Sequence, residues 1–351
     1  DIAKQIYQRV PILQSTDARN REEWHAYYLR LIDYSDHSSF LEPQQSVSSE
    51  RTTSFDSIDR GKKLPIYESK LFHGYDHRYA TYNESGRVEA ILGTQKASPW
   101  GFPRTKFLFP ADAFEQIVSK YDYKSQWFLA VRELTGNTNM RTVIATILPR
   151  LPSFRNTTVT IGLDSAQSAV QLLGILNSFI FDYLARQSLS GNHLSFGFLK
   201  QLPIPPSEKL KQSCKWCSPD VSPCITLILS DWFQSRALEL TYTAWDLQPF
   251  ARDCGYDGPP FRWDEERRFL LRCELDAAYF HLYGIERDDV DYIMETFSIV
   301  KRKDIKAHGE YRTKRVILEM YDAMAAAMQG GAPYGTRLAP PPADPRVAHE
   351  A

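Results

Sequence analysis

The sequence predicts an α+β fold in which a β-rich part is followed by a helical part. Between residues 64 and 161, short apolar runs rich in β-branched and aromatic residues are broken by Gly, Pro and Asn, a pattern typical of strands. After residue 207, apolar residues recur at helical spacing with charges between them, which indicates a helical bundle. A chain of 351 residues with 43% apolar content exceeds one usual hydrophobic core. We therefore expect a helical lead-in and polar loop (1–59), a β-rich domain (60–206), a helical domain (207–328) and a disordered tail (329–351).

The N-terminal part is expected to be a helix and an approach loop. Residues 22–32 place their large apolar side chains on one helical face, which predicts a helix with its aromatics in the core. The Ser/Thr-rich stretch 44–60 shows no periodicity and predicts a mobile loop. The chain begins at Asp1 without Met, inside an expected helix, which suggests a piece of a longer protein.

The β-rich part is predicted to be a twisted, partly closed antiparallel sheet. One short helix, 111–121, interrupts it after Pro110. A long helix over 165–189, capped by Asp164 or Ser165, should pack across the sheet. The expected strands are 80–82, 88–92, 106–109, 126–134, 141–148 and 158–161.

The helical part is expected to contain helices over 225–245, 263–283 and 311–328. Gly284 should end the second of these. The chain after Gln329 is rich in Gly, Pro and Ala, which predicts disorder.

Composition limits the function classes. The net charge is −1, whereas a free-standing DNA-binding domain is usually basic, so any DNA contact would need a local basic face. No apolar run reaches the ~20 residues of a membrane span, and the N-terminus lacks a signal-peptide pattern. We expect a cytoplasmic protein without a membrane partner.

Aromatic rings, histidines and an arginine crowd together in residues 64–82, without a helical or strand period. Flat rings with polar tips next to hydrogen-bond donors are suited to gripping nucleic acid. A buried polar network inside an irregular sheet is the alternative. We assign stacking or backbone contacts to Tyr67, His77 and Arg78.

A turn of sequence Thr-Gly-Asn-Thr-Asn lies between two apolar strands. Asparagine can pair bidentately with adenine and arginine with guanine, each pair being worth ~1–3 kcal/mol of discrimination. Ordinary turn chemistry of asparagine is the alternative. The predicted base-reading residues are Arg132, Asn137, Asn139 and Arg141.

Other cations are predicted to contact phosphates, which fixes register and carries no sequence information. The stretch 301–315 holds seven cations against two acids, and phosphate contacts of such a run would release counterions. A solvated helix face is the alternative. The predicted backbone contacts are Arg150, Arg155, Asn156, Lys200, Lys301, Arg302, Lys303, Arg312, Lys314 and Arg315.

Residues 64–82, LPIYESKLFHGYDHRYATY, resemble the segment that opens the target-recognition region of large adenine-specific DNA methyltransferases. These are the DISARM-like, BREX-like and type IIG-like enzymes of anti-phage and restriction-modification systems. Stretches 127–149, 172–206, 274–304 and 309–324 resemble the same proteins in the same order. The helix followed by Leu-Pro-Ile-Pro-Pro is also similar to the close of the specificity domain of TaqI-like methyltransferases and type I specificity subunits.

The resemblance implies sequence-specific recognition of double-stranded DNA by the sheet and its loops. Its further implied partners are an N-terminal methyltransferase domain of the same protein and other defence subunits. Neither the Asn-Pro-Pro-Tyr loop nor the Gly-rich loop for S-adenosylmethionine occurs in these residues. We therefore expect no catalytic residue and no cofactor here, with S-adenosylmethionine bound elsewhere in the parent enzyme.

Two other function classes stay open. Glu68 and Lys70 match the E-x-K half of a metal-dependent nuclease, which would also need Asp56 or Asp59 to hold Mg²⁺. Alternatively, the chain is a scaffold that docks other defence subunits and binds no DNA.

A metal site is a separate question. Cys214 and Cys217 form a C-x-x-C pair with Cys224 nearby, which allows either a structural zinc or reduced thiols.

Overall fold

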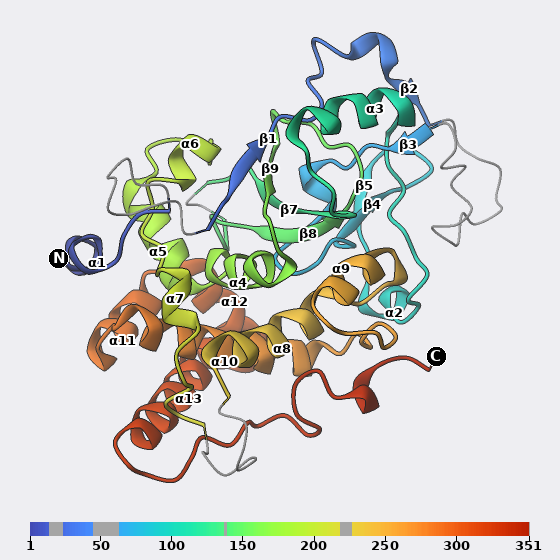
Figure 1. Cartoon of the computed structure of the whole chain (residues 1–351). Helices are drawn as coiled ribbons and strands as arrows, with labels where there is room; N and C mark the ends of the chain where they lie inside the picture. Colours follow the sequence, from blue (N-terminus) through green and yellow to red (C-terminus); the bar gives the residue numbers. More distant parts are fainter. Residues whose placement is uncertain (14–23, 45–62, 137–138, 218–226, 351) are drawn as a thin grey trace.

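The computed structural model describes residues 1–13, 24–44, 63–136, 139–217 and 227–350. Strands gather in the N-terminal half and helices in the C-terminal half, so the predicted α+β class is confirmed. Figure 1 shows the sheet above a layer of helices, with the C-terminal helices of residues 265–328 on the far side from the strands.

The main sheet has four antiparallel strands in the order β1-β9-β7-β8. They are β1 (Tyr27–Leu29), β7 (Trp127–Arg132), β8 (Ala145–Pro149) and β9 (Thr158–Gly162). Successive side chains of a strand point to opposite faces. In β7, Leu129 and Val131 join one hydrophobic cluster, whereas Phe128 and Ala130 join another. The sheet is therefore covered on both faces.

One face is covered by smaller β structure and a helix. A three-stranded sheet is formed by β2 (Glu42–Pro43), β6 (Phe107–Pro110) and β3 (Lys63–Pro65). The hairpin of β4 (Ala80–Tyr82) and β5 (Val88–Ala90) and helix α3 (Ala111–Val118) complete this side. Each of the six predicted strands overlaps an observed one, and the short helix after Pro110 is confirmed.

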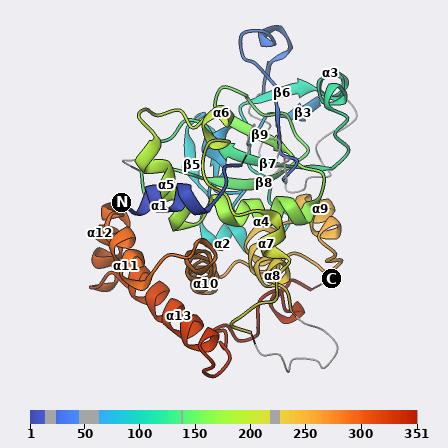
Figure 2. The ribbon, with the colours of Figure 1, turned by 60° about the vertical axis from the view of Figure 1, so that its left-hand side comes forward.

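The other face is covered by helices. The helix pair α4 (Ala166–Leu176) and α5 (Phe179–Ser188) lies between the sheet and the C-terminal helices, as both ribbon views show (Figures 1 and 2). One hydrophobic cluster runs from the strands through α4 and α5 into the C-terminal helices. The predicted boundary at residues 206 and 207 therefore does not separate two hydrophobic cores.

The remaining helices complete the C-terminal layer and the edges. They are α1 (Ile2–Arg9), α2 (Gly93–Lys96), α6 (Phe196–Leu199), α7 (Ser207–Leu210), α8 (Leu229–Thr241), α9 (Gln248–Asp253), α10 (Glu265–Tyr283), α11 (Arg287–Glu295), α12 (Ser298–His308) and α13 (Arg312–Met328). The predicted stop of α10 is confirmed, because Gly284 adopts φ +66° there, a backbone conformation that favours glycine.

The prediction of one continuous helix over 165–189 is wrong, because two helices occupy this stretch. Ser165 caps α4 as expected, but the chain breaks after Leu176 and restarts with Ser178 as the cap of α5. The two helices meet at 66°. The Asn177 side chain bonds both the N–H and the carbonyl of Ala145 in β8, so the sheet itself holds the break in place.

The length and polarity of the helices bear on membrane insertion. Among the described residues, no single helix is long and apolar enough to cross a bilayer. The bent pair α4 and α5 reaches the length and hydropathy of a membrane span only when the two helices are taken together. Most residues of this pair are buried within the protein.

Two other predictions are wrong. Residues 27–29 of the expected helix 22–32 form β1, because they pair with β9, where Gly162 leaves room for the Tyr27 ring. The expected disordered tail is ordered through residue 350, since the buried carboxylate of Glu274 accepts hydrogen bonds from Tyr334 (2.8 Å) and Thr336 (2.6 Å). Most of the polar stretch 44–60 lies outside the described residues.

We expect Gly174→Ala in α4 to destabilise the protein by about 1–3 kcal/mol, because overpacking a tight core costs this much. A Cβ at this position would come within 2.0 Å of the Tyr279 hydroxyl on α10. Tyr279 is itself buried and stacked on Phe233 at 4.4 Å, so it cannot move aside. Urea unfolding measures the change in free energy.

Gly197→Ala in α6 is the matched control, because its nearest neighbour outside the helix backbone is 3.7 Å away. The control should unfold within about 0.5 kcal/mol of the wild type. Equal unfolding free energies for both variants would contradict the close packing of α4 on α10.

Candidate functional site

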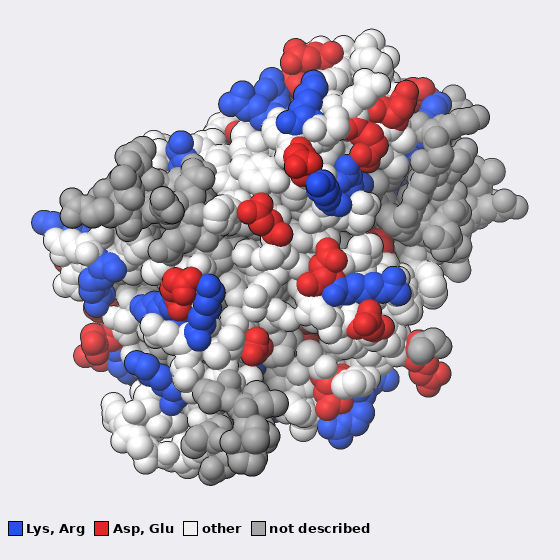
Figure 3. All heavy atoms as spheres, viewed as in Figure 1, with Lys and Arg blue, Asp and Glu red and all other residues white. Residues whose placement is uncertain are grey.

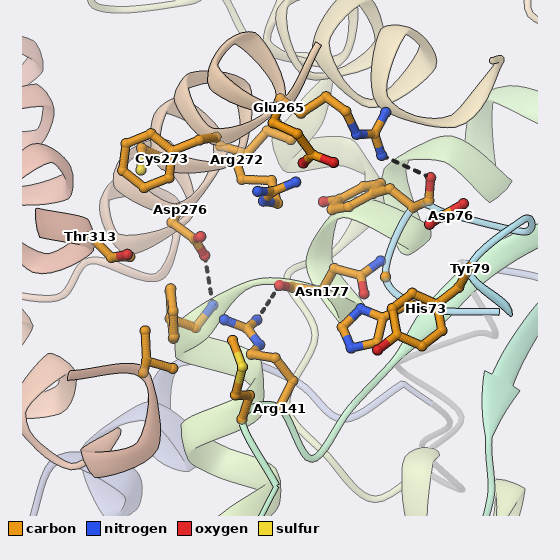
Figure 4. Close-up of a pocket in the computed structure, with 18 of the residues that line it drawn as sticks. His73, Asp76, Tyr79, Arg141, Asn177, Glu265, Arg272, Cys273, Asp276 and Thr313 are labelled. Atoms are coloured by element: carbon orange, nitrogen blue, oxygen red, sulfur yellow. Dashed lines mark hydrogen bonds between the residues drawn. The ribbon is translucent and has the colours of Figure 1, made fainter. Parts of the chain in front are cut away.

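A cavity of about 500 Å³ lies where the β-rich part meets the helices. Its walls come from residues 73–79 before β4, from the break between α4 and α5, and from α10 and α12. Figure 4 shows side chains from these segments converging on one space. The volume is within the range of ligand sites, about 300–1,000 Å³.

Helix α10 presents an unusual face to this cavity. A helix normally buries an apolar stripe, but here the lining residues at intervals of three and four are Glu265, Arg268, Arg272 and Asp276. Groups of this kind are costly to bury without partners. The hydrogen-bond and ion-pair partners of each residue therefore indicate whether it holds the fold together or faces the cavity without a partner.

Arg268 is structural. It is almost fully buried, donates to the carbonyl oxygens of Leu240 (2.6 Å) and Tyr75 (3.3 Å), and lies 3.7 Å above the Trp263 ring. Burial lowers the pKa of its guanidinium to about 9, which leaves it cationic at neutral pH. On the other wall, Lys96 forms a 2.5 Å ion pair with Asp76.

Asp276 is a buried carboxyl group that titrates close to neutrality. One oxygen accepts the backbone N–H of Phe179 at 2.7 Å. Burial raises the pKa of Asp276 to about 6, although nearby Arg141 and Arg272 favour the charged form. The group can therefore accept or donate a hydrogen bond near pH 6, according to its protonation state.

Arg272 is a cation of the cavity that remains available. It is half-buried, and among the residues that the structure describes it makes no hydrogen bond and no ion pair. His73 on the opposite wall is neutral, because burial lowers its pKa to about 3 with a further contribution from Arg132. The His73 ring lies 4.8 Å from that of Tyr79, which is 38% exposed.

The three residues predicted from stretch 64–82 point inward. Tyr67 donates to the carbonyl of His77 (2.5 Å), and His77 lies 3.0 Å from both carboxylate oxygens of Asp246. Arg78 donates to the carbonyls of Ser98 (2.7 Å) and Thr243 (2.8 Å). Because all three are nearly inaccessible, their assignment to direct DNA contacts is wrong in this structure, and the buried polar network describes them.

The four residues predicted at the turn do not form one exposed tip. Arg132 donates to the carbonyl of Phe72 and Arg141 to that of Asn177, and both side chains are half-buried. Arg141 also pairs with Asp182 (3.1 Å) and lines the cavity. Asn139 is exposed, whereas Asn137 lies outside the described residues.

Most of the cations predicted to contact phosphates form ion pairs with acidic side chains. Arg150 pairs with Glu115 at 2.6 Å and Arg155 with Asp33, whereas Asn156 is exposed and Lys200 half-buried at the end of α6. In the basic run, the pairs are Lys301–Glu295 (2.7 Å), Lys314–Asp291 (2.9 Å), Arg312–Glu266 and Arg315–Glu310 (2.7 Å).

Arg302 and Lys303 are exposed and make no bond among the described residues. On the face shown in Figure 3, basic and acidic side chains are interspersed. Most of the basic run therefore fits the alternative interpretation, a solvated helix face.

Glu68 and Lys70, the two residues of the alternative nuclease prediction, form an ion pair with each other. Lys70 lies 3.0 Å from Glu68, which also accepts from the Tyr82 hydroxyl at 2.6 Å. Asp56 and Asp59 lie outside the described residues, and within the described ones no group of three or more His, Cys, Asp or Glu could hold a metal. Cys214 and Cys217 form a disulfide, whereas Cys224 lies in an undescribed stretch.

Comparison with known proteins gave no match to any family model, curated protein or solved structure. The charged face of α10 was not among the predicted sites. The signal was present, because Glu265, Arg268, Arg272 and Asp276 share one helical stripe.

We expect the unfolding free energy of the wild type to fall relative to that of Asp276→Asn as the pH rises from 4 to 7. The unfolded carboxyl has a pKa near 3.8 and the folded one about 6, so the folded state holds the extra proton between these values. The loss of stability therefore builds up between pH 4 and pH 6, is complete above pH 6 and vanishes below pH 4. The expected change is about 2–3 kcal/mol.

Urea unfolding of both proteins across this range measures the difference. A difference that is constant with pH, or one that grows in favour of the wild type at pH 7, would contradict the raised pKa of Asp276.

Proposed function

We propose that this chain provides sequence-specific recognition of double-stranded DNA for an adenine-specific methyltransferase of restriction-modification or anti-phage defence. The observation that carries the proposal is the convergence of cationic and aromatic side chains from the β-rich and helical parts on one cavity. The ordered resemblance of five stretches of the sequence supports the same function. Methyl transfer and S-adenosylmethionine belong to a catalytic domain outside these residues, in a cytoplasmic enzyme.

The chemistry of the cavity suits nucleic acid. Arginine binds phosphate through a planar fork of donors, and aromatic rings stack on bases of any sequence. Arg272 supplies an uncommitted guanidinium, and Tyr79 supplies a partly exposed ring. His73 and Asp276 add polar groups that can distinguish base edges by donating or accepting hydrogen bonds.

The basic run has a smaller role than its sequence suggests. Arg302 and Lys303 on α12 are exposed and unpaired among the described residues, and the same helix lines the cavity through Val300 and Asp304. In this proposal, these two cations hold the DNA backbone beside the site. The ion-paired Arg315 contributes little, because an incoming phosphate would have to displace Glu310 and Glu319.

A scaffold that docks other defence subunits is the second candidate. The observation that favours it is the neutralisation of the basic run by Glu266, Asp291, Glu295 and Glu310. A scaffold of this kind would show no salt-steep affinity for DNA.

We expect the variant Arg302→Ala/Lys303→Ala to bind mixed-sequence duplexes more weakly than the wild type at low salt. Each lost phosphate contact reduces the slope of log affinity against log salt by about 1, so the double variant should lose about 2. Fluorescence anisotropy with labelled duplexes at several salt concentrations gives both quantities.

Arg315→Ala is the matched control, since its cation is already paired, and its salt slope should equal that of the wild type. Duplex affinity that is absent, or insensitive to salt, would support the scaffold and overturn the proposed function.

A further inference from the structure

The hairpin of β4 and β5 leaves one strand edge open. Strand β5 (Val88–Ala90) pairs with β4 on one side only, and all three of its residues are exposed. The backbone bonds of Arg87 and Ile91 run toward the β4 side, and successive residues of a strand direct these bonds to opposite sides. The N–H and carbonyl groups of Val88 and Ala90 therefore point away from β4. Within the described part of the chain they make no hydrogen bond.

The side chains on this edge do not guard it against pairing. An open edge is a template for another strand, and proteins usually protect it with repelling charges, Pro or a bulge. Here one residue of each sign, Arg87 and Glu89, lies on the same face of the strand. Both are exposed, Arg87 forms no ion pair among the residues that the structure describes, and Glu89 accepts only the exposed amide of Asn83 at 3.2 Å. The opposite face carries Val88, which is 38% exposed.

We propose that two copies of this chain pair antiparallel through β5, with Val88 on the two-fold axis. In such an isologous contact each residue meets its counterpart twice. This register places Arg87 opposite Glu89 of the second copy and Glu89 opposite its Arg87. Opposite charges facing each other across strands are stabilising, so the edge complements itself.

The neighbouring registers are excluded by charge or by occupied backbone groups. With Glu89 on the axis, the two Glu89 side chains would face each other, and like charges directly opposite are destabilising. With Ala90 on the axis, Val88 would face Leu92 of the second copy. The N–H of Leu92 is already bound by the Gln95 side chain at 2.8 Å, so that ladder could not form in full.

In the proposed register the backbone groups of the open edge are satisfied. The N–H and carbonyl of Val88 bond the same groups of the second copy, and the Ala90 N–H donates to the Gly86 carbonyl. The two hairpins then form one continuous sheet across the dimer. A strand of three residues contributes less contact than the ~1,200–2,000 Å² of a stable interface, so the dimer forms reversibly at high concentration. This inference goes beyond the proposed function and does not depend on it.

Sedimentation velocity over a range of protein concentrations measures the association constant of the wild type, which should show a monomer–dimer equilibrium. Arg87→Glu should weaken association by about tenfold, because it places a carboxylate opposite Glu89 in both halves of the contact. The double variant Arg87→Glu/Glu89→Arg exchanges the two charges. It should restore the wild-type constant within about threefold.

Val88→Pro tests the backbone contribution. Proline removes an N–H that points to the open edge, where it is tolerated in a strand, and this change should abolish association. Lys120→Glu is the matched control for Arg87→Glu, because it reverses an exposed cation outside the hairpin. It should keep the wild-type constant, and circular dichroism checks that each variant is folded.

A wild type that stays monomeric at every concentration would overturn the inference and leave the edge free for a strand of another protein. Association that Arg87→Glu and Val88→Pro both leave unchanged would overturn it too, since the copies would then meet through another surface. A double variant as weak as Arg87→Glu alone would contradict the register. The proposed function is tested separately, because none of these outcomes measures DNA affinity.

Discussion

The structure depends on the buried hydrogen bonds that join residues 75–78 to the helical part. His77 pairs with Asp246, Arg78 donates to the Thr243 carbonyl, and the Tyr75 carbonyl accepts from Arg268 of α10. The guanidinium groups of Arg78 and Arg268 are nearly inaccessible to water, and a buried charge without its partner costs several kcal/mol. Because these particular hydrogen bonds exist only when the two parts are docked, we expect each part to stabilise the folding of the other.

The cavity is a consequence of this docking. Its floor and walls belong to segments far apart in the sequence, from His73 to Thr313. Bonds within the protein occupy Arg268, Lys96, Asp76 and Arg141, whereas Arg272 makes no hydrogen bond or ion pair with the residues that the structure describes. Whether a charged residue holds the fold together or can bind a ligand therefore depends on its hydrogen-bond and ion-pair partners. It does not depend on the residue type.

Local signals predicted much of the fold. The strands followed from β-branched and aromatic runs, the start of α4 from Ser165 and the end of α10 from Gly284. The break at Asn177 was not predictable, because it is fixed by bonds to Ala145 in a strand that the sequence does not place next to it. Burial of Tyr67, His77 and Arg78 escaped prediction for the same reason, since their partners lie up to 169 residues away. The basic run looked free in sequence because its acids come from other helices, such as Glu266.

Native-state hydrogen exchange of the free protein tests the central claim most directly, because it measures the opening free energy of each segment. If the β-rich and helical parts fold only together, the slowest amides of β7 and of α10 should open with the same free energy, equal to that of global unfolding. A lower opening free energy for α8 and α10, with β7 still protected, would show that the helical part detaches on its own and would contradict the claim.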